Sequence, residues 1–216
     1  MHAQIVLFDG FDPLDVIAPY EVLVAGSDYV GGELDVELVT AEGPRTVVSG
    51  SRGLTLRATA GLDPAKPGYV IVPGASGPLA GDPDEIDTIP VLLARFGETA
   101  AVPLIRAALA NPEVTVATVC GGSLALAMAG LLEGLANTHH LGVEMLEAAG
   151  AVPVAARVVD DGDLVTAGGV TSGLDLALHL LERTYGPHIA LAVEQMFAFE
   201  RRGTVWTAGG REPQAW

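Results

Sequence analysis

Residues 114–132, VTVATVCGGSLALAMAGLL, decide the fold, because they combine a buried strand with a helix that follows it directly. The β-branched run before Cys120 predicts a short buried strand, and the pattern after Gly122 predicts a helix. The only cysteine of the chain therefore lies on a strand-to-helix turn. Such a turn strains its central residue and needs small neighbours, which Gly121 and Gly122 supply. The stretch predicts a nucleophile elbow, in which the reactive side chain stands clear of the sheet.

The position of Cys120 favours a reactive thiol. Thiolate is the nucleophilic form of cysteine, and the free amides and positive dipole end of a following helix lower a thiol's pKa. We therefore expect the pKa of Cys120 to lie below the ordinary thiol value. The alternative is a small buried side chain without chemistry, since free cysteine is among the most buried residue types. The strand, the two glycines and the helix together favour the nucleophile.

The composition indicates a globular α/β protein. Hydrophobic residues make up 50% and charged residues 18% of 216 residues, which suits one domain with a sizeable core. The net charge of −16 argues against nucleic acid and anionic membrane surfaces as partners. A single cysteine cannot form an internal disulfide, and neither a signal-like segment nor a membrane-length apolar run is apparent. We therefore expect a cytoplasmic protein.

The order of elements predicts a single-domain, flavodoxin-like fold. Residues 4–8 form an apolar run without polar alternation, as expected of a strand in a parallel sheet covered on both faces. Further strands are expected at 34–40 and 69–72, and hairpins at 47–56 and 157–166. Helices are expected from residue 14, from 137 through 149, and at 174–185. A further helical stretch is expected within 85–110, with interruptions at Gly97 and Pro103. We predict a mostly parallel sheet with helices on both faces over residues 1–200.

The segment 201–216 is predicted to be a C-terminal tail. It is polar and rich in glycine, apart from Trp206 and Trp216. Two tryptophans in so polar a segment indicate that it packs on a partner subunit or on the rim of the site.

Three loops are expected at the edge of the sheet that carries Cys120. Asp15 falls near the carboxyl end of the first strand, where open α/β sheets place ligand sites, although an ordinary acid at a helix N-terminus is the favoured explanation from position alone. The loop 73–78, PGASGP, leaves amides open in the manner of an oxyanion hole, or is simply a turn. The glycines of 167–173 let the backbone pass close to a neighbouring group.

Adjacent histidines at 139 and 140 raise the question of a metal site. No cysteine or further histidine lies at ligand spacing, so we expect no metal. The alternative for His139 is a residue that caps or packs at the start of a helix.

Five motifs then show a family resemblance. They are LFDGFDPLDVIAPYEVL (7–23), VIVPGASG (70–77), VATVCGGSLALAMAGLLEG (116–134), ANTHH (136–140) and LVTAGGVTSGLDLALHLLE (164–182). In this order they resemble the DJ/PfpI superfamily of class I glutamine-amidotransferase-like proteins, over roughly residues 5–195. Within it the sequence is most similar to isocyanide (isonitrile) hydratase and to the N-terminal ligand-binding halves of AraC-type regulators.

The resemblance implies a set of site residues. Cys120 would be the nucleophile and Asp15 the general acid and base that faces it. The substrate-binding positions would be Gly74 and Ala75, whose amides help to form an oxyanion site, the Gly121 amide, and the hydrophobic Val170, with Thr171 and His139 as further candidates. Hydratases of this kind generally carry Thr directly after the cysteine, where this chain has Gly121. Branches with peptidase or deglycase activity carry His there, and its absence counts against a Cys–His dyad.

The implied activity is hydration of an isonitrile to an N-substituted formamide through a covalent thioimidate, without a cofactor or metal. The partner would be a small-molecule substrate, and the superfamily is commonly dimeric, so we expect a homodimer. One alternative is a non-enzymatic small-molecule or redox sensor, although the acidic remainder of the chain offers no helix-turn-helix. Another is an amidase, peptidase or deglycase, which would need His139 or His140 within reach of Cys120.

Overall fold

The apolar segments of the sequence form the centre of one sheet in the computed structural model, which describes residues 1–82, 85–209 and 211. Within these residues the sheet has eight strands in the order β12-β10-β11-β7-β6-β1-β2-β5. Neighbouring strands are parallel except for the antiparallel pair of β10 and β11. The strands are β1 (His2–Val6), β2 (Asp35–Thr40), β5 (Ala60–Gly61), β6 (Gly68–Val72), β7 (Val114–Val119), β10 (Val158–Asp160), β11 (Leu164–Ala167) and β12 (Trp206–Thr207).

Two small two-stranded sheets accompany the main sheet. One is the antiparallel hairpin of β3 (Arg45–Val48) and β4 (Thr55–Ala58). The other pairs β8 (Leu135–Ala136) with β9 (Val152–Pro153) in parallel. The predicted hairpins at 47–56 and 157–166 are thereby confirmed as β3–β4 and β10–β11.

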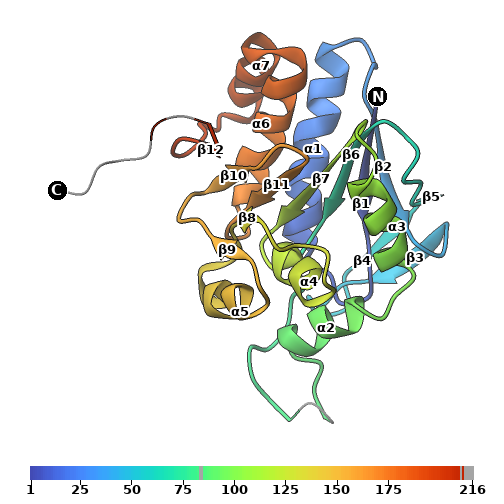
Figure 1. Cartoon of the computed structure of the whole chain (residues 1–216). Helices are drawn as coiled ribbons and strands as arrows, with labels where there is room; N and C mark the ends of the chain where they lie inside the picture. Colours follow the sequence, from blue (N-terminus) through green and yellow to red (C-terminus); the bar gives the residue numbers. More distant parts are fainter. Residues whose placement is uncertain (83–84, 210, 212–216) are drawn as a thin grey trace.

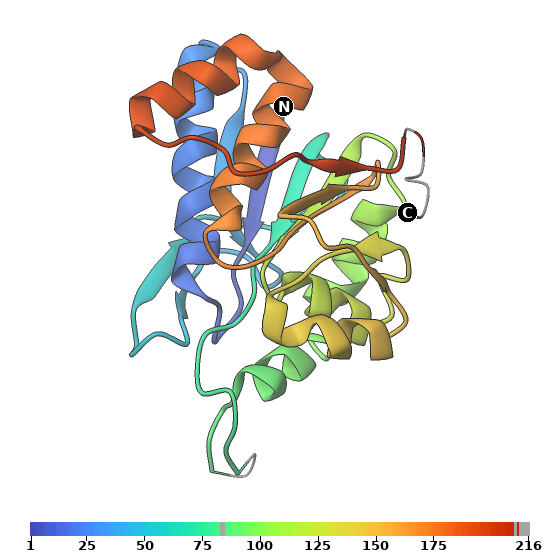
Figure 2. The same cartoon turned by 90° about the vertical axis from the view of Figure 1, so that its left-hand side faces the viewer.

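Helices cover both faces of the main sheet (Figures 1 and 2). The helices α1, α6 and α7 pack on one another over one face, whereas α2, α3 and α4 lie on the other side, with α5 beside α4. Their bounds are α1 (Pro13–Tyr29), α2 (Ile89–Phe96), α3 (Ala101–Leu109), α4 (Gly122–Met128), α5 (Val143–Ala148), α6 (Ser172–Tyr185), α7 (Pro187–Phe197) and the 3-10 helix η1 (His140–Gly142). The predicted α/β fold is confirmed.

One expected interruption of a helix is absent. Pro103 lies in the first turn of α3, where its missing N–H costs no helical hydrogen bond, so α3 continues through it. Helix α1 likewise continues through Pro19 to Tyr29. The expected single helix from residue 137 through 149 is instead the short η1 followed by α5.

The described part of the tail packs on its own chain. Trp206 and Thr207 form β12, which pairs with β10, so the sheet extends past residue 200. Arg201 forms ion pairs with Glu182 and Glu194. Trp216 lies outside the described residues. No described helix is long and apolar enough to cross a membrane.

Candidate active site

Cys120 is held in a strained backbone conformation at the end of β7. Its φ of 56° lies in the left-handed region, which is costly for a residue with a side chain. Its N–H donates to the Ala167 carbonyl at 3.0 Å, and its carbonyl accepts from Thr138 Oγ1 at 2.8 Å. These neighbours maintain the strain, and the predicted nucleophile elbow is confirmed as a backbone geometry.

The two glycines after Cys120 differ in how much space surrounds them. A Cβ atom on Gly122 would lie 2.2 Å from the Val72 carbonyl oxygen, so the start of α4 approaches the end of β6 too closely for any side chain. A Cβ on Gly121 would instead meet Leu93 Cδ1 at 3.2 Å. Leu93 thus occupies the space beside the position where similar hydratases carry Thr.

Asp15 is brought to Cys120 by the order of the strands. The cap of α1 is Asp12, whose Oδ1 accepts from Leu14 N–H at 2.9 Å, and this places Asp15 in the first turn. Since β1, β6 and β7 are neighbours, the loops after them meet at one edge of the sheet. Asp15 is fully buried there, and its Oδ2 accepts from the Gly74 N–H at 2.9 Å.

The thiol and the carboxyl form an interacting pair. The Cys120 side chain interacts with the carboxyl of Asp15, whose buried Oδ1 has no partner of full hydrogen-bond geometry. The expectation that the Gly74 amide is open to a substrate is therefore wrong, because this amide holds Asp15 in place. A Cβ on Gly74 would lie 2.6 Å from the Gly121 nitrogen and 2.9 Å from Asp15 Oδ2, so the contact requires glycine.

The electrostatics of the pair reverse the expectation for the thiol. Burial, reinforced by the charge of Asp12, raises the pKa of Asp15 to about 8, against the opposing Gly74 hydrogen bond. Burial and then the carboxyl of Asp15 raise the pKa of Cys120, and the N–H of Gly121 opposes them without outweighing them. The predicted lowering is wrong because one amide of a seven-residue helix faces both desolvation and a carboxylate. Near neutral pH both groups of the pair are uncharged.

The thiol opens into a small and mainly apolar pocket of about 150 Å³. Its wall includes Ala75, Gly121 and Val170, as the sequence predicted. Other apolar members of the wall are Leu79, Ile89, Pro90, Leu93, Leu124, Leu141 and Met145. Thr171 is not among the wall residues, and its Oγ1 accepts from Arg157 Nη2 at 2.9 Å instead.

His139 lies in the wall of the thiol pocket, and His140 does not. The Nδ1 atom of His139 accepts from Leu141 N–H at 3.2 Å, so the predicted capping role is confirmed. Burial and the neighbouring ring of His140, 4.2 Å away between centroids, lower the pKa of His139.

A possible metal site lies far from the thiol in the sheet. Among the described residues, the ligand atoms of His2, Asp35 and Glu37 lie within 4.8 Å of one another. They belong to the start of β1 and to β2, at the edge opposite the thiol pocket. Glu37 already forms an ion pair with Lys66 at 2.9 Å. The thiol pocket contributes no residue to this group.

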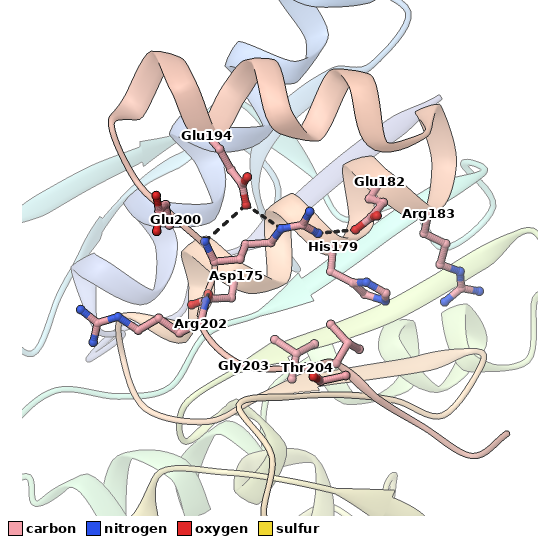
Figure 3. Close-up of a pocket in the computed structure, with 12 residues that line it drawn as sticks. Asp175, His179, Glu182, Arg183, Glu194, Glu200, Arg202, Gly203 and Thr204 are labelled. Atoms are coloured by element: carbon pink, nitrogen blue, oxygen red, sulfur yellow. Dashed lines mark hydrogen bonds and ion pairs between the residues drawn. The ribbon is translucent and has the colours of Figure 1, made fainter. Parts of the chain in front are cut away.

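A second, polar pocket of about 680 Å³ lies between α6, α7 and residues 200–205 (Figure 3). Several of its charged side chains attach the tail: Arg201 reaches Glu182 and Glu194, and Asp175 Oδ1 accepts from Arg202 N–H at 2.7 Å. None of the predicted site residues lines it. The candidate active site is therefore the thiol pocket.

Sequence reasoning missed two polar residues of the site. Asp12 lines the thiol pocket and raises the pKa of Asp15, and the Asp-Pro pair of a helix start was a signal for its capping role. Thr138 fixes the Cys120 carbonyl, and no local pattern indicates this contact, because the two residues are 18 positions apart.

The fold and site define an α/β protein with a cysteine on a nucleophile elbow beside a buried carboxyl group. The model of the DJ-1/PfpI family matches residues 94–183. Isonitrile hydratase of Pseudomonas putida is 36% identical over 193 residues, which cover 88% of this chain and 74% of the relative. The chain belongs to the DJ-1/PfpI family.

A regulator and a solved structure extend the comparison. The HTH-type transcriptional regulator CdhR of Pseudomonas aeruginosa is 26% identical over 200 residues, covering 91% of this chain and 54% of the regulator. The crystal structure of Drosophila melanogaster DJ-1beta matches with a TM-score of 0.75 at 20% identity, over 92% of this chain and 98% of that chain. The latter likeness concerns the fold.

Proposed function

We propose that this protein hydrates an isonitrile to an N-substituted formamide, with Cys120 as the nucleophile and Asp15 as the general acid and base. The observation that carries the proposal is the strained Cys120 beside the buried carboxyl of Asp15, at the floor of an apolar pocket. The 36% identity to an isonitrile hydratase supports the same reaction.

The uncharged state of the pair suits the first step. The terminal carbon of an isonitrile has both a lone pair and electrophilic character. The sulfur of Cys120 attacks this carbon while the protonated Asp15 donates its proton to the same carbon. The proton of the thiol then passes to Asp15. The product is a thioimidate, R–N=CH–S–Cys, and Asp15 ends the step as it began. A carboxyl whose pKa is raised to about 8 is protonated at neutral pH and can donate in this way.

Water completes the reaction in the second step. The protonated Asp15 gives its proton to the thioimidate nitrogen as the oxygen of a water molecule attacks the thioimidate carbon, and the carboxylate so formed takes one proton from that water. The resulting adduct, R–NH–CH(OH)–S–Cys, collapses to R–NH–CHO as the carbon–sulfur bond breaks. The second proton of the water passes through Asp15 to the sulfur and restores the thiol. The sum is one isonitrile and one water converted to one formamide.

The pocket wall supports an uncharged substrate with an apolar substituent. Its side chains are mainly aliphatic, and Leu79, Leu141 and Met145 at the pocket are also exposed to solvent. Apolar contacts of this kind bind hydrocarbon groups and exclude water from the reacting atoms.

A second candidate function is the sensing of a small molecule by the same pocket. The relatives that are HTH-type transcriptional regulators favour it. This chain spans about half of the regulator CdhR, at 54% of its length. In that case the pocket would bind a ligand without converting it.

The first experiment is a turnover assay of the purified protein with an aryl isonitrile, beside the Cys120→Ala variant. Chromatography would follow the aryl formamide. We expect the formamide from the wild type alone, because the variant lacks the attacking sulfur. If neither protein forms it, the isonitrile reaction is wrong and sensing becomes the leading candidate. Formamide from both proteins would remove Cys120 from the mechanism.

A further inference from the structure

The hydrogen bond at Nδ1 determines which nitrogen of His139 carries the proton. Nδ1 accepts from the Leu141 N–H, so this nitrogen presents its lone pair. A neutral imidazole then carries its proton on Nε2. Burial and His140 lower the pKa of the ring, which favours this neutral form. In the thiol pocket His139 is consequently a hydrogen-bond donor through Nε2, and it has no free lone pair with which to act as a base.

The other polar side chains of the pocket wall are already engaged. Thr138 donates its hydroxyl proton to the Cys120 carbonyl, and Asp12 accepts from Leu14 N–H. Asp15, behind the thiol, is bound to Gly74. Among the described side chains of this wall, the Nε2–H of His139 is the one N–H donor left without a protein partner. Cys120 and His139 line the same pocket of about 150 Å³.

In the proposed reaction, such a donor would act on the nitrogen of the thioimidate. When water adds to the thioimidate, the electron pair of the carbon–nitrogen double bond moves to the nitrogen, which becomes more basic and more negative. A fixed donor aimed at this nitrogen stabilises the transition state more than the ground state. Asp15 exchanges protons with the water and the nitrogen in this step, so it is not itself a fixed donor at the nitrogen.

We infer that His139 is a further catalytic residue, whose Nε2–H donates a hydrogen bond to the substrate-derived nitrogen during the addition of water. The inference rests on the proposed isonitrile hydration. His139 transfers no proton in this step: it stays neutral, and the protons follow the path through Asp15.

Two substitutions of His139 separate this role from capping. His139→Asn keeps an acceptor near the position of Nδ1, so it retains the cap of η1, but it has no donor at the position of Nε2. His139→Gln extends an amide N–H toward the position of Nε2 and lacks the short-range acceptor. His188→Gln is the matched control, because His188 is exposed on α7 and lies outside the thiol pocket.

The experiment measures kcat and KM for an aryl isonitrile with all four proteins, and their melting temperatures. We expect His139→Asn to keep its melting temperature and to lose about tenfold to a hundredfold in kcat, as for a lost transition-state donor. His139→Gln should recover at least part of that loss, and His188→Gln should match the wild type. A second readout is the ¹⁵N NMR spectrum of the free protein, where we expect the proton of His139 on Nε2.

Each contrary outcome has a distinct meaning. An active wild type whose kcat is unchanged in His139→Asn and reduced in His139→Gln would show that His139 only caps η1, and would overturn this inference alone. A proton on Nδ1 in the NMR spectrum would also overturn it. A wild type without formamide would overturn the proposed function, and the inference with it.

Discussion

At the level of single residues, the proposed chemistry depends on Cys120 and Asp15 both being uncharged before a substrate binds. Cys120 and Asp15 are both removed from water, which raises both pKa values. The carboxylate of Asp15 further disfavours the thiolate, whereas the hydrogen bond with Cys120 opposes the rise in the pKa of Asp15 without outweighing burial. The thiol is therefore not a standing thiolate of the kind that a helix terminus alone would produce. Its reactivity arises when the carboxyl accepts the thiol proton during attack on a substrate.

The pH dependence of alkylation tests this state of the thiol. We expect the rate of Cys120 alkylation by iodoacetamide to rise with an apparent pKa above the ordinary thiol value of about 8.5. Asp15→Asn should lower that apparent pKa, because it removes the carboxylate that opposes the thiolate. Mass spectrometry reads the label without ambiguity, since the chain has one cysteine, and Cys120→Ala gives the blank. An apparent pKa below the ordinary value in the wild type would contradict the uncharged pair.

At the scale of elements, the site depends on a close contact between the start of α4 and the end of β6. The carbonyl of Val72 leaves no room for a Cβ atom on Gly122, and this carbonyl belongs to the backbone. Neither element can yield by rotating a side chain. This contact fixes the elbow against the loop that holds Asp15 through Gly74.

Alanine substitutions of the two glycines test this contact. Gly122→Ala should destabilise the protein by about 1–3 kcal/mol or more, because the new methyl group overlaps with a backbone oxygen. Gly121→Ala is the matched control: its φ of −68° suits any residue, and the new atom approaches closely only the side chain of Leu93, at 3.2 Å, and lies at an ordinary 3.5 Å from Gly74 Cα. Urea denaturation of both variants measures the difference. Equal loss of stability in the two would show that the contact is not tight.

For the whole molecule, a buried acid with a raised pKa has a cost in stability. The pKa of Asp15 is about 8 in the folded state and about 4 in an unfolded chain. Between these values the folded state binds more protons than the unfolded state, so the contribution of Asp15 to stability is full below about pH 4 and falls as the pH rises towards about 8. The site is therefore maintained at the expense of stability at alkaline pH, which the rest of the core must offset.

Calorimetry as a function of pH tests this linkage. Asp15→Asn keeps an oxygen that can accept from Gly74 and cannot ionise. Relative to the wild type, its melting temperature should rise as the pH is increased from about 5 to about 8.5. Using the difference between the two proteins cancels the titration of all other groups. Parallel curves for the two proteins across this range would contradict the raised pKa.

Much of the fold could be predicted from local patterns. The apolar strands, the two hairpins and the strand-to-helix turn at Cys120 each depend on residues close in sequence. The break between α2 and α3 at Gly97 also follows from the local sequence. The interruption expected at Pro103 is wrong, because Pro103 lies in the first turn of α3, where a proline does not break a helix. The strand β12 had no local signal, since two residues become a strand only through pairing with β10.

The sequence by itself determined the α/β class, the elbow, and the candidates for the nucleophile and its acidic partner, because these follow from short-range periodicity, turn chemistry and family motifs. Only the tertiary structure decided the use of the Gly74 amide, the direction of the thiol pKa and the presence of His139 in the pocket. The physical reason is that each depends on burial and on contacts between distant segments, and desolvation outweighs the local effect of a helix terminus.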